Sequence, residues 1–100
     1  MTKKFIVVID NSKKEQDDAF LEYIKKNNLN WWHWINNLWL LIDYSGNLSA
    51  VQLRDLLQTY YPEINCIVFE HNDEPWAGRG PGGQDRNMFT WLNGTWDKAQ

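Results

Sequence analysis

The alternation of apolar and polar positions predicts four strands, two helices and a short helical segment over residues 85–96, with Met88, Trp91, Leu92 and Trp96 on one side. Strands are expected over residues 4–10, 64–71 and the two arms of a hairpin at 31–42, and apolar side chains recur at helical spacing over 12–28 and 49–61. The resulting order, β-α-β-β-α-β, is the ferredoxin-like plan. We therefore expect an α+β fold in which a four-stranded antiparallel sheet carries two helices on one face.

Two short motifs are expected to begin the helices. Ser12 is followed three residues later by Glu15, and Ser49 by Gln52. A serine with Glu or Gln three residues later forms a capping box, because each side chain accepts a hydrogen bond from a backbone N–H of the first turn. The sequence therefore predicts N-caps at Ser12 and Ser49.

The hairpin carries apolar side chains on both of its faces. Asn36 and Asn37 tolerate the positive φ of a two-residue turn, which would pair Ile35 with Leu38 and set the register. Successive residues of a strand point to opposite sides of the sheet. One face then carries Trp32, Trp34, Trp39 and Leu41, and the other carries Trp31, His33, Ile35, Leu38, Leu40 and Ile42. We expect the helices to cover the second, mostly aliphatic face.

The tryptophan face of the hairpin needs a cover of its own, because a monomer rarely exposes an apolar patch larger than a few hundred Å². Three covers are available: the chain's own tail, a second copy of the chain, or a ligand that stacks. Trp32, Trp34 and Trp39 are therefore predicted to form a dimer or ligand face. Aromatic residues on a sheet are a known platform for stacked bases.

Composition limits the class of protein. One hundred residues suit one domain, which we place at 1–71, followed by a tail at 72–100 that holds a glycine-rich loop and three tryptophans. A single cysteine excludes a disulfide within the chain, and no apolar run has the length of a membrane span, so a cytoplasmic location is expected. The net charge of −3 argues against binding to duplex nucleic acid.

The tail matches the sequence motif of a phosphate-binding loop but lacks the strand and helix that directly flank such a loop. Residues 78–83 match G-x-G-x-x-G, but Pro81 interrupts the motif and no strand-to-helix turn is expected there. Backbone N–H groups and arginines beside tryptophans nevertheless suit a base next to a phosphate. The predicted ligand-binding residues are Trp76, Gly78, Arg79, Gly80, Gly82, Gly83, Arg86 and Trp91.

Three features of the sequence together resemble one known family. They are a first strand that ends in Asp10, a tryptophan-rich hairpin with Leu38-Trp39-Leu40-Leu41, and a fourth strand followed by a tail. This family comprises the ferredoxin-like second CRISPR adaptation protein and its bacterial relatives. The resemblance implies a homodimer joined through its sheets and a divalent-cation phosphodiesterase site at the residue matching Asp10. We expect strands one and three to run parallel, so that Asp43 lies at the same edge of the sheet as Asp10 and assists it.

Three functions follow as hypotheses. The first is a homodimeric protein that binds a nucleotide or a cyclic oligonucleotide without a cofactor or bound metal, for example a phage-type protein that sequesters a defence signal. The second is a nuclease that uses Asp10 with Mg²⁺ or Mn²⁺. The third is a protein–protein interaction module. The sequence favours binding over catalysis, because it holds no Ser-His-Asp or paired-cysteine arrangement.

Overall fold

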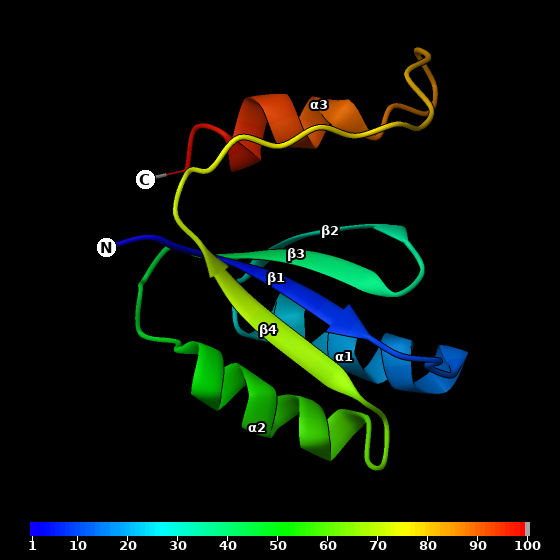
Figure 1. The fold of residues 1–100 in the computed structure, drawn as a ribbon, viewed down its shortest axis with the longest axis vertical. Helices are drawn as coiled ribbons and strands as arrows, with labels where there is room; N and C mark the ends of the chain where they lie inside the picture. Colours follow the sequence, from blue (N-terminus) through cyan, green and yellow to red (C-terminus); the bar gives the residue numbers. More distant parts are fainter. Residues whose placement is uncertain (100) are drawn as a thin grey trace.

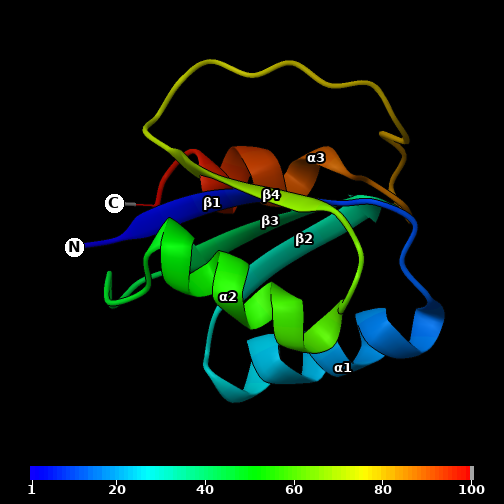
Figure 2. The same ribbon diagram turned by 60° about the horizontal axis from the view of Figure 1, so that its bottom comes forward.

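The computed structural model describes residues 1–99 and has the predicted α+β architecture. Residue 100, the last of the predicted tail, lies outside the described residues. A four-stranded sheet separates two helices on one face from the C-terminal segment, residues 72–99, on the other (Figures 1 and 2). The elements are β1 (Lys3–Ile9), α1 (Lys14–Lys26), β2 (Asn30–Ile35), β3 (Leu38–Asp43), α2 (Ala50–Tyr60), β4 (Cys66–His71), α3 (Phe89–Trp91) and η1 (Leu92–Trp96).

The strand order is β2-β3-β1-β4, and every neighbouring pair is antiparallel. β3 therefore lies between β1 and β2, which is the split β-α-β arrangement of ferredoxin-like folds. The prediction that β1 and β3 run parallel is wrong. Asp43 pairs with Lys3, whereas Asp10 follows Ile9 at the other end of β1, about 23 Å away at 3.3 Å per residue.

The predicted N-cap is confirmed for α2, but α1 begins one residue later than predicted. Ser49 Oγ accepts a hydrogen bond from the Gln52 N–H at 3.1 Å, and Gln52 Oε1 accepts one from the Ser49 N–H at 2.9 Å. In α1 the equivalent bond runs from the Lys13 N–H to Gln16 Oε1 at 2.8 Å. The predicted Ser12 cap is wrong.

The hairpin turns where the sequence predicts and then changes register. Ile35 pairs with Leu38, but Trp32 pairs with Leu40 and not with Leu41, because β2 accommodates one extra residue between Trp32 and Ile35. A one-residue shift moves a side chain to the other face of the sheet. Trp32 and Trp39 therefore lie on opposite faces, and the predicted composition of the two faces is wrong.

The face covered by α1 and α2 holds the main core. Trp39 lies at its centre, 1% exposed, with its ring 5.2 Å from Phe20 in an edge-to-face contact and 3.7 Å from the parallel ring of His33. The other fully buried side chains of this core include Phe5, Val7, Ile9, Ile24, Leu41, Leu53, Leu57 and Tyr61. The helices thus cover the Trp39 side of the sheet, which corrects the expectation that they cover the Leu40 side.

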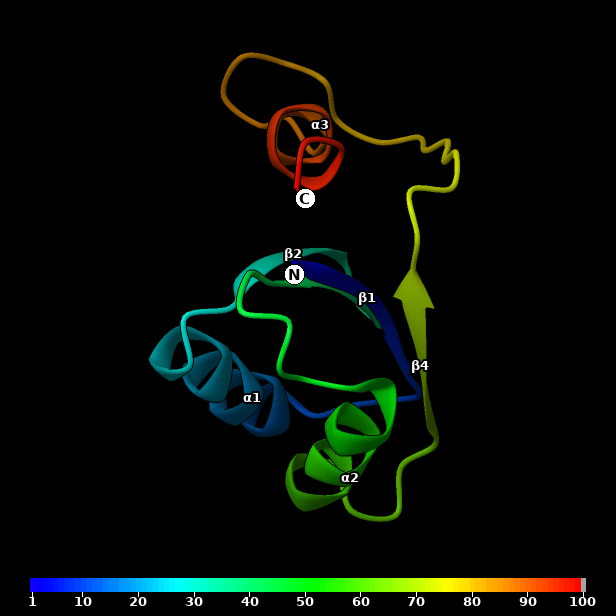
Figure 3. The same ribbon diagram turned by 90° about the vertical axis from the view of Figure 1, so that its left-hand side faces the viewer.

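The second face of the sheet is covered in part by the C-terminal segment (Figure 3). α3 and η1 form a short helical stretch that bears Leu92 and Trp96 inward, just after the buried Met88. The sheet residues beneath it are Trp32, Leu40 and Ile42. A second core therefore lies between the sheet and residues that are distant in sequence.

Candidate functional site

The C-terminal segment and the sheet together line an apolar cavity of about 210 Å³ that is open on one side. Its floor includes Ile6 and Leu40, and Trp32 and Trp96 form part of its wall. Trp76, Ala77, Gly78 and Met88 also line it, from the extended stretch after β4 and the start of the helical stretch. Its one ionisable lining side chain is His71, whose ring centroid lies 5.2 Å from that of Trp96. The cavity suits a flat apolar group.

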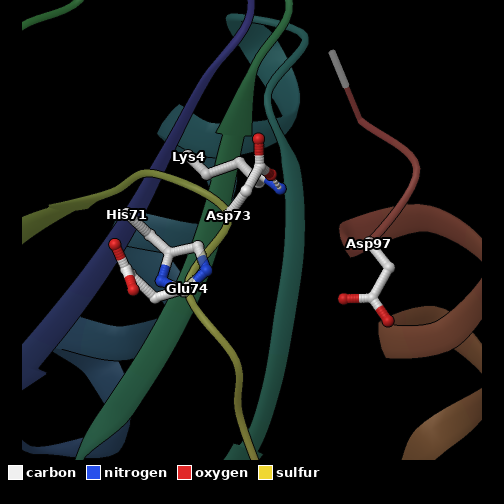
Figure 4. A pocket seen from close by; sticks show the side chains of 5 residues that line it. All are labelled: Lys4, His71, Asp73, Glu74 and Asp97. Atoms are coloured by element: carbon white, nitrogen blue, oxygen red, sulfur yellow. Dashed lines mark hydrogen bonds and ion pairs between the residues drawn. The ribbon is translucent and has the colours of Figure 1, made fainter.

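A polar hollow of about 160 Å³ shares His71 with the apolar cavity (Figure 4). Lys4 of β1 lies in it beside Asp73 and Glu74, which follow β4, and Asp97 comes from the C-terminal end of the chain. The Lys4 ammonium is almost fully buried and donates to Asp73 Oδ1 at 2.5 Å and to the Trp96 carbonyl at 3.0 Å. Lys4 therefore ties β1 to the C-terminal segment.

The charges of this hollow disfavour an anion. The hydrogen bond and charge of Lys4 hold the pKa of Asp73 below its usual value, so Asp73 is ionised at neutral pH. Glu74 and Asp97 add carboxylates, and Lys4 is the one lysine or arginine among the lining residues. A phosphate placed here would face net negative charge.

Three indole N–H groups are already occupied by hydrogen bonds of the C-terminal segment. Trp32 donates to the Met88 carbonyl at 2.9 Å, and Trp76 donates to Asp97 Oδ1 at 2.7 Å. Trp91 donates to the Asn30 side chain at 2.9 Å. Trp76 and Trp32 line the cavity, whereas Trp91 is not among the lining residues. These bonds hold the tryptophans in fixed positions.

The glycine-rich stretch forms a turn and a packing surface. Gly82 forms an isolated antiparallel bridge with Asn87, and the Gly83 N–H donates to the Arg86 carbonyl at 3.1 Å, which closes a small hairpin. Gly80 packs so closely on Met88 that a Cβ there would collide with the sulfur. Among these residues, Gly78 is the one that lines the cavity.

The two predicted ligand-binding arginines lie in different surroundings. Arg79 is exposed, and it directly follows Gly78, which lines the cavity. Arg86 lies with its guanidinium carbon 5.5 Å from the centroid of the Trp34 ring, a cation–π contact on the surface. Trp34 is 37% exposed and is the most accessible of the three predicted face tryptophans.

The predicted face of Trp32, Trp34 and Trp39 does not exist as one surface. Trp39 is buried under the helices, and its indole N–H has no hydrogen-bond partner among the described residues. Trp32 is buried under the C-terminal segment, with its indole edge toward Met88. The stacking platform proposed from the hairpin is therefore replaced by a cavity that Trp32 lines from one side.

The two carboxylates of the nuclease hypothesis have unrelated roles. Asp43 is a loop cap: its carboxylate accepts from the Ser45 hydroxyl at 2.6 Å and from the Leu48 N–H at 2.9 Å. Burial raises the pKa of Asp43, but these hydrogen bonds outweigh it and hold the pKa below its usual value. Asp10 is exposed at the far end of β1, and no group of three metal-ligating side chains occurs within residues 1–99.

His71 and Met88 line the cavity but were not among the predicted ligand-binding residues. His71 ends the strand predicted over residues 64–71, and as the last residue of β4 it points to the face opposite the helices. His71 lies two residues after Phe69 in the same strand, so the sequence pattern already indicates that both side chains point to the same face of the sheet. Met88 stood on the apolar side of the short helix expected over residues 85–96, and in the structure it is buried against the sheet together with Leu92 and Trp96.

Comparison with protein-family models, with curated proteins and with solved structures finds no match. The resemblance to the CRISPR adaptation protein therefore stays a prediction. Within residues 1–99 no helix is long and apolar enough to cross a membrane.

Proposed function

We propose that this chain is a binding protein that holds a planar ring, such as a nucleobase, in the apolar cavity between the sheet and the C-terminal segment. The observation that carries the proposal is the cavity itself, with aromatic walls from Trp32 and Trp76. Indole faces favour stacking on flat rings, and a base–aromatic stack contributes about 1–3 kcal/mol. His71 supplies one polar group that can orient the ring.

The orientation of a nucleotide follows from the charges at the two ends of the cavity. The hollow beyond His71 is rich in carboxylates, so a phosphate would lie at the opposite side, near Gly78 and the exposed Arg79. Arg79 is then the phosphate contact, and the remaining glycines serve the fold of the loop. This arrangement keeps the nucleotide hypothesis and confines it to fewer residues.

The test is a titration of ¹⁵N-labelled protein with adenosine, AMP and cyclic diadenylate, followed by NMR. We expect the indole N–H signals of Trp32 and Trp76 to shift with adenosine, and AMP to bind more tightly through Arg79. Arg79→Ala should remove the difference between AMP and adenosine. Ring compounds that leave both indole signals unmoved would contradict the proposal.

A variant that fills the cavity supplies the control. Ala77 is an exposed lining residue, so Ala77→Trp should occupy the cavity and abolish binding without unfolding the protein. Gln58→Trp adds the same exposed indole on α2, away from the cavity, and should bind as the wild type does. Equal binding by both variants would place the ligand elsewhere.

A further inference from the structure

The outer edge of β4 is an unpaired, apolar edge. β4 lies at the end of the sheet and pairs with β1 alone among the described strands. Ile67 is 50% exposed and Phe69 is 52% exposed, and both point to the part of the second face that the C-terminal segment leaves open. Exposed edges with apolar side chains pair readily with another strand.

The helix side of the same edge is apolar as well. A groove between α2 and β4 is lined by Ala50, Val51 and Arg54 of the helix and by Cys66, Ile67 and Val68 of the strand. Val51 is among the most exposed large apolar side chains of the protein. Both sides of the β4 edge thus present groups that water solvates poorly.

We propose that β4 pairs with β4 of a second copy of this chain, which joins two sheets into one of eight strands. An antiparallel pair about a two-fold axis at Val68 places Ile67 opposite Phe69 of the partner subunit, twice, because the contact is isologous. The same register sets Cys66 opposite Glu70 of the partner subunit. No like charges then face each other along Cys66–His71.

Charge complementarity supports the second copy as occupant. Cys66 and Arg54 line the same groove, so Glu70 of the partner subunit would approach the Arg54 guanidinium. Arg54 already contacts the exposed Asp55 at 2.9 Å, and in the dimer it would bridge two carboxylates. The two-fold axis repeats this contact on both sides of the junction.

The test is sedimentation velocity of the full chain over a range of concentrations. The wild type should sediment as a dimer, and Phe69→Lys should weaken association by about tenfold or more, because it brings charge into the junction. Tyr44→Lys is the control: Tyr44 is 50% exposed but lies beyond the end of β3, so this variant should remain a dimer. Circular dichroism should show both variants folded.

A charge exchange tests the register. Glu70→Arg should weaken the dimer, and the double variant Arg54→Glu with Glu70→Arg should restore association. A monomeric wild type at all concentrations would overturn the proposal and leave the β4 edge to another partner. A dimer that persists in Phe69→Lys would also overturn it, because the interface would then lie elsewhere.

Discussion

The indole N–H of Trp32 donates to the backbone carbonyl of Met88 at 2.9 Å, and both residues are buried. This bond joins the edge strand β2 to the residue that precedes α3, 56 positions later. It fixes the C-terminal segment over the sheet at the wall of the apolar cavity. The stability of the fold and the shape of the candidate site therefore depend on the same contact.

Replacing Trp32 by Phe removes this hydrogen bond and leaves the Met88 carbonyl buried without its donor. We expect the free energy of unfolding to fall by about 1–3 kcal/mol. Urea unfolding followed by circular dichroism measures the change. Trp34→Phe is the control, since Trp34 is partly exposed, and it should change stability by less than about 0.5 kcal/mol.

Two glycines of the same loop should respond differently to alanine. Gly80→Ala places a Cβ against the Met88 sulfur and should lower stability by about 1–3 kcal/mol, as overpacking does. Gly82→Ala meets no atom within 4 Å and should leave stability unchanged or raise it by up to about 1 kcal/mol. Thermal unfolding compares the two. Equal losses would mean that Gly80 is not packed on Met88.

Asp43 should make stability depend on acid pH. The hydrogen bonds of its carboxylate lower its pKa in the folded protein, so the stabilisation is complete above about pH 4, the unfolded value, and is lost as the pH falls through the folded value. Asp43→Asn should be less stable at pH 7 and should show a flatter dependence below pH 4. Urea unfolding at a series of pH values tests this, and an unchanged acid limb would contradict it.

Lys4 should control the ionisation of Asp73. Lys4→Met removes the cation that lowers the pKa of this carboxyl, so the pKa should return toward its ordinary value. A ¹³C NMR titration of the carboxyl signals reports the shift directly. The Asp43 carboxyl, whose pKa is lowered by the hydrogen bonds of its own loop, serves as an internal reference and should titrate alike in both proteins.

Part of the candidate site was predictable and part was not. Trp76 and Gly78 were expected from the tail, because an aromatic residue beside glycine and arginine indicates a ligand contact, and both line the cavity. Arg86 and Trp91 were expected beside them but are held by Trp34 and Asn30. Side-chain partners of this kind lie far apart in sequence, so spacing along the chain does not reveal them.

The misplaced pairing of Asp10 with Asp43 had a different cause. β2 returns parallel to β1 after the crossover helix, and the hairpin reverses β3, so β3 must run against β1. The antiparallel direction of β1 and β3 follows from the order of the elements along the chain, and it places the two carboxylates at opposite ends of these strands. The strand directions therefore place Asp43 too far from Asp10 to assist it, as the nuclease hypothesis requires.

Local patterns were enough to predict the order of strands and helices, the hairpin turn and the cap of α2, because each depends on residues within a few positions of one another. The register of β2 and the cover of the second face depend on contacts made in the folded chain. The bulge between Trp32 and Ile35 turns Trp32 toward Met88, and the segment that brings Met88 there is more than fifty residues away. Contacts between distant residues are selected by the packing of the whole chain, which no local pattern records.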